Sequence, residues 1–233
     1  MKRGSGFVAC VTILLAWGVL AFGAVYPWAY WPLAVGTAAT GVYGLVRRRD
    51  VRGLVPGVGL QAAFAATFVA MTLQTIPVRR DTIAQWSPNT ARLLQDYDVL
   101  YAAGAPRHAL SLQPEATFVT VILFTVLVVF LFGATRALSL GASSRMTSAI
   151  VVLGVMVAVV GIVQKPFFYT GKIYGFWTPY GHGIPFGPFV NRNHYGGWMA
   201  MALSLSLGYF CGRVAQASMH IRPGFRNRLL WCV

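Results

Sequence analysis

The chain has 233 residues, of which 57% are hydrophobic and 10% are charged, and its formal net charge is +14. A soluble domain would carry about a quarter charged residues, so the composition excludes an ordinary soluble protein and predicts a membrane protein. The basic residues stand in short segments between apolar runs, a distribution typical of membrane topology, and we therefore set nucleic acid aside as a partner.

Six apolar runs are long enough to cross a bilayer as helices. They predict an all-α fold, a polytopic transmembrane helix bundle that occupies residues 1–233 as a single domain. The first run follows Lys2 and Arg3 as a signal peptide would, but no small-x-small cleavage site precedes Pro27, which indicates a retained helix. The predicted spans are residues 7–25, 29–46, 54–76, 116–135, 147–164 and 194–212.

The basic residues also predict an orientation. With the N-terminus inside, the inner segments hold 12 of the 19 Lys and Arg residues and the outer segments hold 7. Because basic residues favour the cytoplasmic side, we expect both termini in the cytoplasm.

Two outer segments are long, residues 77–115 and 165–193. In the first, Ser87 and Pro88 are suited to begin a short helix. Such a helix would lie on the outer membrane surface through one apolar face. The residues predicted for that face are Leu93, Tyr97, Leu100 and Tyr101.

Two spans carry a small residue at every fourth position, which in lipid lets helix backbones approach closely. These rows predict packing faces and say nothing of chemistry. They are Gly36, Thr40 and Gly44 in one span, and Gly196, Ala200, Ser204, Gly208 and Gly212 in another.

The cluster Asn191-Arg192-Asn193-His194 stands at the outer end of the last span. Asn191 is a good N-cap, and a helix that begins here would direct free N–H groups and its positive dipole end outward. Arg192 adds a forked donor suited to phosphate oxygens, and Lys165 and Lys172 add charge from the same outer segment. These residues predict a site for a phosphate or diphosphate at the headgroup level.

A plainer interpretation stays open, in which Arg192 reaches lipid phosphates, the asparagines cap a helix and His194 is an interfacial residue. The other candidates are weaker. His182 is a possible base in a glycine-rich loop, Asp96 and Asp98 are possible cation ligands on what is otherwise a solvated helix surface, and Gln74 and Gln164 are interfacial residues near the outer ends of spans. The cysteines, Cys10, Cys211 and Cys232, indicate neither a disulfide framework nor a metal site.

The stretch FGPFVNRNHYGGWMAM, residues 186–201, resembles the signature of the O-antigen ligase and polysaccharide polymerase superfamily, a group of bacterial membrane proteins. Three further stretches agree and occur in the family's order. They are AFGAVYPWAYWPLAV, then SPNTARLLQ with HALSLQPEATF, and TGKIYGFW. Tyr195 and Gly197 stand where the family usually has Phe and Ala.

The resemblance implies a membrane-embedded glycosyltransferase of the C type in the bacterial inner membrane. Such enzymes transfer or polymerise a glycan held on undecaprenyl diphosphate, on the periplasmic side, to lipid A core or a growing chain, and they use neither a metal nor a nucleotide sugar as cofactor. It also implies that Arg192, with Asn191, Asn193 and His194, lies at or near the polyprenyl-diphosphate site. Lys172 is a further candidate for binding the diphosphate, on the charge argument given above.

Family members usually have ten or more spans, with a large periplasmic loop in the second half that carries further arginines and a catalytic histidine. Nothing in this sequence matches that loop, so we expect the chain to be the N-terminal half of the architecture, truncated at its C-terminus. Whether this chain alone is an enzyme is left open, and no catalytic residue is assigned. The alternative function is a non-enzymatic accessory subunit or lipid-linked glycan carrier in envelope assembly.

Overall fold

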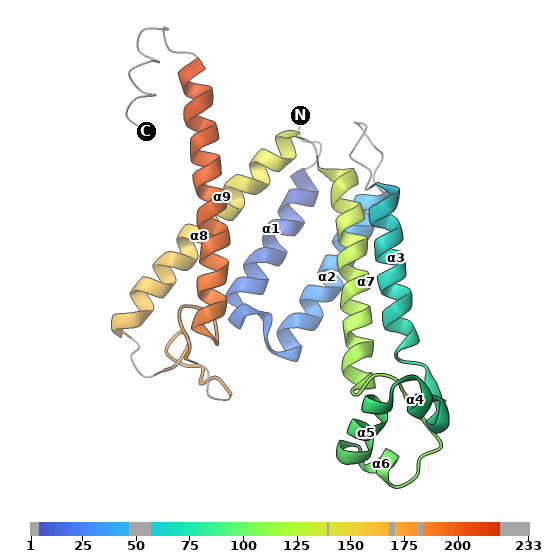
Figure 1. The fold of residues 1–233 in the computed structure, drawn as a ribbon. Helices are drawn as coiled ribbons and strands as arrows, with labels where there is room; N and C mark the ends of the chain where they lie inside the picture. Colours follow the sequence, from blue (N-terminus) through green and yellow to red (C-terminus); the bar gives the residue numbers. More distant parts are fainter. Residues whose placement is uncertain (1–4, 47–56, 139, 168–170, 181–183, 220–233) are drawn as a thin grey trace. The chain divides into compact units, whose positions relative to one another are not determined.

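The structure, a computed structural model, describes residues 5–46, 57–138, 140–167, 171–180 and 184–219. The chain is mostly helical (Figure 1), which confirms the all-α fold class at that level. It divides into two compact units, residues 1–36 with 138–233 as unit 1 and residues 37–137 as unit 2. The two units are described separately below.

All six apolar runs form helices where the structure describes them. The helices are α1 (Ser5–Leu20), α2 (Pro27–Val46), α3 (Val58–Leu73), α7 (Pro114–Ala137), α8 (Leu140–Phe167) and α9 (Arg192–Met219). The first helix ends five residues before the predicted end of its run, for a reason given below. In contrast, α8 and α9 extend beyond their predicted spans.

Two helices are long and apolar enough to cross a membrane, Pro114–Ala137 and Ala142–Gln164. Two further apolar helices, Gly6–Leu20 and Val58–Leu73, are shorter. Length and composition of the described helices therefore support a membrane protein, and the six-span topology remains a prediction.

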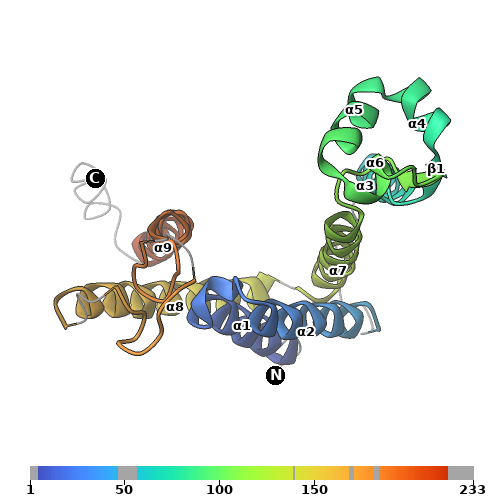
Figure 2. The same cartoon turned by 90° about the horizontal axis from the view of Figure 1, so that it is seen from below.

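In unit 1, α8 lies against both α1 and α9 (Figures 1 and 2). Small residues make the approach of α8 to α9 possible: a Cβ on Gly154 would lie 3.0 Å from that of Ala202, and one on Gly161 would lie 2.6 Å from the Tyr195 hydroxyl. The buried core between these elements consists of Val19, Leu153, Val157 and Phe189.

A left-handed turn joins α1 to α2. Phe22, Gly23 and Ala24 have φ angles of 60°, 71° and 53°, and they form the short helix η1 (Phe22–Ala24). A right-handed helix cannot continue through residues with positive φ, so α1 ends before this turn. For residues with a Cβ, such as Phe22 and Ala24, the left-handed conformation costs about 1–2 kcal/mol each. Such strain is kept where the surrounding structure requires it, and Phe22 is indeed buried.

In unit 2, the second half of α2 packs closely on α7. A Cβ on Gly41 would lie 2.8 Å from the backbone of Phe130, and one on Gly44 would collide with the backbone of Gly133. The small-residue row that includes Gly44 is thus a packing face, as predicted. The row on α9 is not packed in the described part of the chain, because nothing lies within 4 Å of a Cβ built on Gly196, Gly208 or Gly212.

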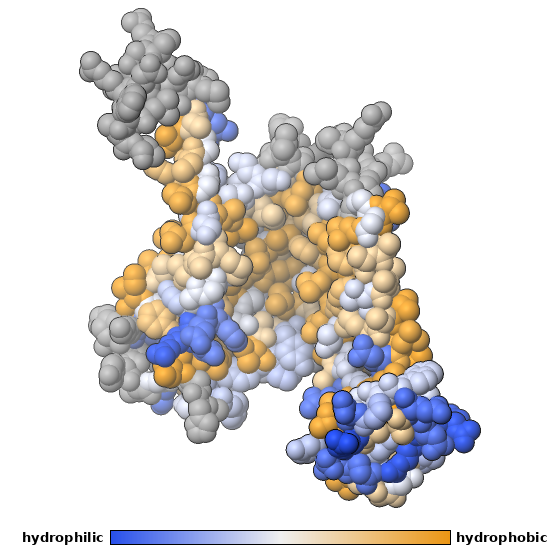
Figure 3. All heavy atoms as spheres, in the orientation of Figure 1, coloured by the Kyte–Doolittle hydropathy of each residue, from blue (hydrophilic) through white to orange (hydrophobic). Residues whose placement is uncertain are grey.

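Residues 77–115 of unit 2, which the sequence predicts to be an outer segment, are folded rather than coiled. The strands β1 (Pro77–Arg79) and β2 (Arg107–Ala109) pair antiparallel and close it at its base. Between them stand α4 (Arg80–Trp86), α5 (Pro88–Tyr97) and α6 (Val99–Ala102), around a buried cluster of Ile83, Leu94 and Tyr101. Figure 3 shows that this segment is largely hydrophilic, whereas the helices are mostly apolar on the surface.

The predicted start of α5 at Pro88 is confirmed, but the four residues predicted for one apolar face are divided between two helices, and Tyr101 is buried in the cluster. Leu93, Tyr97 and Leu100 are exposed, Tyr97 by 84%. The helix ends at Tyr97, and the Oδ1 atom of Asp98 accepts a hydrogen bond from the Tyr101 amide at 2.7 Å to begin α6. Because the chain turns at Asp98, the residues after it leave the helical period on which the prediction depended.

Candidate functional site

The start of α9 lies in unit 1 and follows the predicted capping pattern. The helix begins at Arg192, and the Oδ1 atom of Asn191 accepts a hydrogen bond from the Asn193 amide at 2.8 Å. Asn191 is therefore the N-cap, as the sequence predicted.

The expected row of free amides is absent from this helix start. The Arg192 amide donates to the Ile184 carbonyl at 2.9 Å, and the His194 amide donates to the Asn191 carbonyl at 3.1 Å. The prediction of free N–H groups was wrong because the preceding loop folds back and supplies acceptors. What remains for an anion is the dipole end of α9 and the side chains.

These side chains have no acidic partner in their own unit. Arg192, Asn193 and His194 are exposed, and so is Lys172. All five Asp and Glu residues of the sequence fall within residues 37–137, so unit 1 contains no carboxylate side chain. The basic groups at the start of α9 therefore lack a counter-ion within unit 1, which makes an external anion favourable there.

A buried glutamine connects Lys172 to the helices. Gln164 is 8% exposed, and its Nε2 atom donates to the Lys172 carbonyl at 3.3 Å. Its Oε1 atom is buried and has no partner among the described residues. Leaving a buried carbonyl unpaired costs about 1–3 kcal/mol, so this atom calls for an explanation.

The loop before α9 forms two tight turns. Ile173 pairs with Trp177 and Phe186 pairs with Phe189 across isolated bridges. Gly187 has a φ of 55° within the second turn, and a Cβ there would lie 2.9 Å from the Tyr195 ring. Each turn holds aromatic side chains against the end of α1 and the following left-handed turn.

Phe22 is at the centre of this aromatic cluster. Its ring stacks on Trp177 with centroids 5.0 Å apart and meets Trp28 edge-on at 5.8 Å. The Trp177 indole N–H donates to the Tyr26 hydroxyl at 3.1 Å. The stretches AFGAVYPWAYW and TGKIYGFW, far apart in sequence, are thus one packed unit. The sequence alone does not predict their contact.

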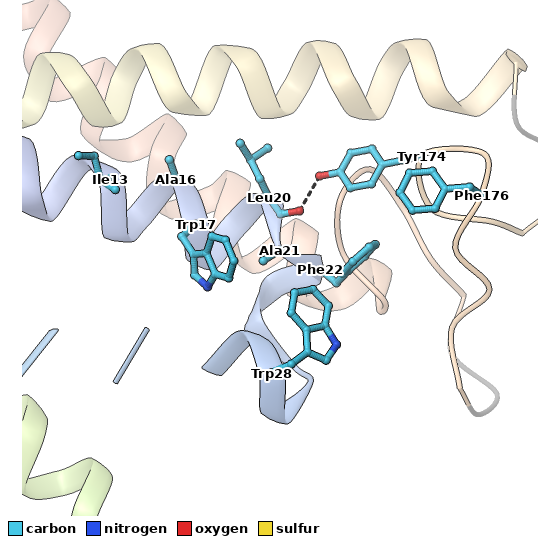
Figure 4. Close-up of a pocket in the computed structure, with 9 residues that line it drawn as sticks. All are labelled: Ile13, Ala16, Trp17, Leu20, Ala21, Phe22, Trp28, Tyr174 and Phe176. Atoms are coloured by element: carbon cyan, nitrogen blue, oxygen red, sulfur yellow. Dashed lines mark hydrogen bonds between the residues drawn. The ribbon is translucent and has the colours of Figure 1, made fainter. Parts of the chain in front are cut away.

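A pocket of about 550 Å³ opens beside the cluster, between α1 and the turn that contains Tyr174 (Figure 4). Its lining is almost wholly apolar because two of its polar atoms are already bonded. The Tyr174 hydroxyl donates to the Leu20 carbonyl at 2.8 Å, and the Trp17 indole N–H donates to the Ala29 carbonyl at 2.9 Å. The lining residues are Ile13, Ala16, Trp17, Leu20, Ala21, Phe22, Trp28, Tyr174 and Phe176.

The environment of Tyr174 also changes its acidity. Burial raises the pKa of its hydroxyl from the ordinary value of 10.0 to about 12, because the phenolate would lose solvation there. The group therefore remains a hydrogen-bond donor to the end of α1 throughout the neutral range.

One contact links the surroundings of the pocket to the loop before α9. Gly23 follows Phe22 of the pocket wall, and a Cβ on Gly23 would lie 2.7 Å from the ring of Phe189. Phe189 is two residues before the N-cap Asn191. Unit 1 thus has both an apolar pocket and a basic helix start, two features that an amphiphile with an anionic head requires.

Other sequence candidates are placed elsewhere. Asp98 caps α6, and its Oδ2 atom lies 3.4 Å from the His108 Nε2 atom. The sequence had not singled out His108, whose contact with Asp98 depends on the pairing of β1 with β2. Asp96 and Gln74 are exposed, and no group of three potential metal ligands occurs among the described residues. His182 and Cys232 lie outside the described residues, as does the side chain of Lys165.

Comparison with known proteins gives no further guidance, since no family model, curated protein or solved structure matches the chain.

Proposed function

We propose that the chain is a polytopic membrane protein that binds a polyprenyl-diphosphate-linked glycan at its outer face. In this proposal the six apolar helices span the bacterial inner membrane with both termini in the cytoplasm. The resemblance of residues 186–201 to the O-antigen ligase and polymerase signature supports this assignment. The acceptor would be a further glycan or lipid A core.

The observation that carries the proposal is the packing of Phe189, two residues before the N-cap of α9, on Gly23, which follows Phe22 of the pocket wall. A polyprenyl diphosphate has a long hydrocarbon tail and a doubly charged head. Arg192 and Lys172 would bind the head, because neither has a carboxylate partner within unit 1. The pocket beside Phe22 would take the isoprene units nearest the head.

In glycan transfer, the acceptor oxygen forms a bond to the anomeric carbon as that carbon's bond to the diphosphate breaks. The acceptor proton passes to a base, and the diphosphate leaves with its negative charge. Arg192 would stabilise that charge more strongly as it develops. Since unit 1 has no carboxylate, no acidic residue of that unit is available as the base.

The second candidate is a non-enzymatic carrier or accessory subunit that binds the same lipid without transferring it. This function needs no base, and unit 1 offers none of the carboxylate type. The two functions predict the same site and different products.

Reconstitution separates them. The chain would be placed in proteoliposomes with an undecaprenyl-diphosphate-linked oligosaccharide, and glycan elongation and release of undecaprenyl diphosphate would be measured together with binding. Transfer that is lost in Arg192→Ala and kept in Arg213→Ala, at the other end of α9, supports the glycosyltransferase. Binding without transfer supports the carrier, and the absence of binding contradicts both.

A further inference from the structure

The buried Gln164 lies on the face of α8 that packs toward α9. Leu153, Val157, Gly161 and Gln164 fall four, four and three residues apart along one side of the helix, and all four are buried. This spacing places them on one stripe. Gln164 is therefore the outermost buried residue of the stripe.

The register of the two helices puts Gln164 level with the start of α9. The helices run antiparallel, with Ser148 bonded to the Tyr209 hydroxyl, Gly154 against Ala202 and Gly161 against Tyr195. Three residues further out on α8 is Gln164, and three residues further out on α9 is Arg192. The unpaired Oε1 atom thus lies at the depth of the proposed diphosphate site.

A carbonyl oxygen accepts hydrogen bonds and cannot donate them. A partner for it must therefore bring an N–H or O–H group, which a water molecule or a ligand hydroxyl supplies. A diphosphate joined to a lipid at one end and a sugar at the other is ionised at neutral pH and has no proton to give, and its hydrocarbon tail has none either. The sugar has hydroxyl groups and, in acetamido sugars, an N–H group.

Among the described residues, one other buried side-chain atom has no partner, the Trp198 Nε1, and it is too deep for this role. Trp198 follows Arg192 by six residues, which is about 9 Å further along α9 at 1.5 Å per residue. It packs on the apolar core of Val19 and Val157. Of the two side chains, Gln164 and Trp198, only Gln164 lies at the level of the proposed diphosphate.

We propose that the Oε1 atom of Gln164 accepts a hydrogen bond from the sugar that is attached directly to the diphosphate. Gln164 thereby distinguishes a glycan-bearing carrier lipid from the bare one. This inference depends on the proposed function. The same side chain, through its Nε2 atom, holds the backbone of Lys172, so the sugar contact and the position of a diphosphate contact are linked.

The test compares three probes of equal charge, each with a tail short enough to keep it soluble in water. P1-farnesyl-P2-methyl diphosphate has no donor group, whereas P1-farnesyl-P2-glucosyl and P1-farnesyl-P2-N-acetylglucosaminyl diphosphates have several. Dissociation constants would be measured for the full chain in nanodiscs. A hydrogen bond to a buried polar group predicts that a sugar probe binds about 10-fold more tightly than the methyl probe.

Gln164→Leu removes the acceptor and is expected to reduce this preference to about equal binding. Gln164→Glu keeps an acceptor oxygen and should retain most of the preference for the sugar probes, even though its negative charge weakens the binding of every probe. Gln74→Leu, a change at the exposed glutamine at the end of α3, is the matched control and should leave the preference unchanged. Circular dichroism checks that each variant is folded.

Equal binding of the sugar and methyl probes by the wild-type chain would overturn the inference while the proposed function stands. A sugar preference that survives in Gln164→Leu would also overturn it. If the wild-type chain binds none of the probes, the proposed function and the inference both fail.

Discussion

Gly23 and Phe189 are in contact across 166 residues of sequence, so closely that a Cβ on Gly23 would lie 2.7 Å from the Phe189 ring. Gly23 belongs to the left-handed turn after α1, and Phe189 belongs to the loop that leads into α9. The contact packs the turn that contains the pocket residue Phe22 against the loop that leads into α9, and it depends on the absence of a side chain at residue 23.

Gly23→Ala should therefore destabilise unit 1 by about 2 kcal/mol or more, because it adds a Cβ at a φ of 71° and displaces the Phe189 ring. Thermal unfolding in detergent measures the effect. Gly196→Ala is the control, since nothing lies within 4 Å of its Cβ position. Equal melting temperatures for the two variants would contradict the packing described here.

Because burial raises the pKa of Tyr174, we expect the free energy of unfolding to fall at alkaline pH. Its pKa in the folded protein is about 12, above the ordinary 10.0. The folded state therefore keeps the proton while the unfolded state loses it, and the stabilisation present below pH 10.0 is lost as the pH rises toward about 12.

Tyr174→Phe should lower stability by about 1 kcal/mol at neutral pH through loss of the bond to Leu20, and should lose less stability than the wild type above pH 10.0. Melting temperatures at neutral pH and above pH 10.0 test both statements. An equal alkaline loss in the two proteins would show that another group is responsible.

Asp98 is expected to stabilise the segment of residues 77–115 locally, through its cap on α6 and its contact with His108. Asp98→Ala removes the cap of α6 and the contact with His108, and should cost about 1–2 kcal/mol. Asp98→Asn keeps the capping oxygen and should recover most of this. Hydrogen exchange at the Tyr101 amide reports the change directly, and Asp96→Ala, at an exposed position, should leave it unaltered.

The proposed topology predicts which cysteines react from outside. In a background without Cys10, Cys211 and Cys232, Tyr180→Cys should react with a membrane-impermeant thiol reagent in intact cells, since Tyr180 is 80% exposed. Ser144→Cys, near the start of α8, should react only after the membrane is opened. The reverse pattern would invert the orientation and place the site in the cytoplasm.

The sequence predicted the helices well because each apolar run is long and bounded by polar or glycine-rich segments. It also predicted the cap at Asn191, since capping is a local property of neighbouring residues. The left-handed turn at Phe22 was missed, because the surrounding aromatic rings from Trp177 and Trp28 stabilise it and pairings between distant residues leave no periodic signal.

At the candidate site, too, the sequence predicted local features and missed those that depend on contacts between distant residues. Arg192 and Lys172 were identified from their types and positions, but the free amides expected beside them are occupied by the Ile184 and Asn191 carbonyls. Gln164 was considered interfacial, and only the packing of α8 against α9 shows it to be buried. The pocket could not be anticipated either, because it depends on the bond from Tyr174 to Leu20.

The measurement that tests the account most directly is the affinity of the chain for P1-farnesyl-P2-methyl diphosphate, with and without the Arg192 charge. The account predicts that Arg192→Gln weakens binding at least about 10-fold, as loss of a charge-assisted contact should, and that Arg213→Gln leaves it unchanged. Equal affinities for the wild type and Arg192→Gln would contradict a diphosphate site at the start of α9.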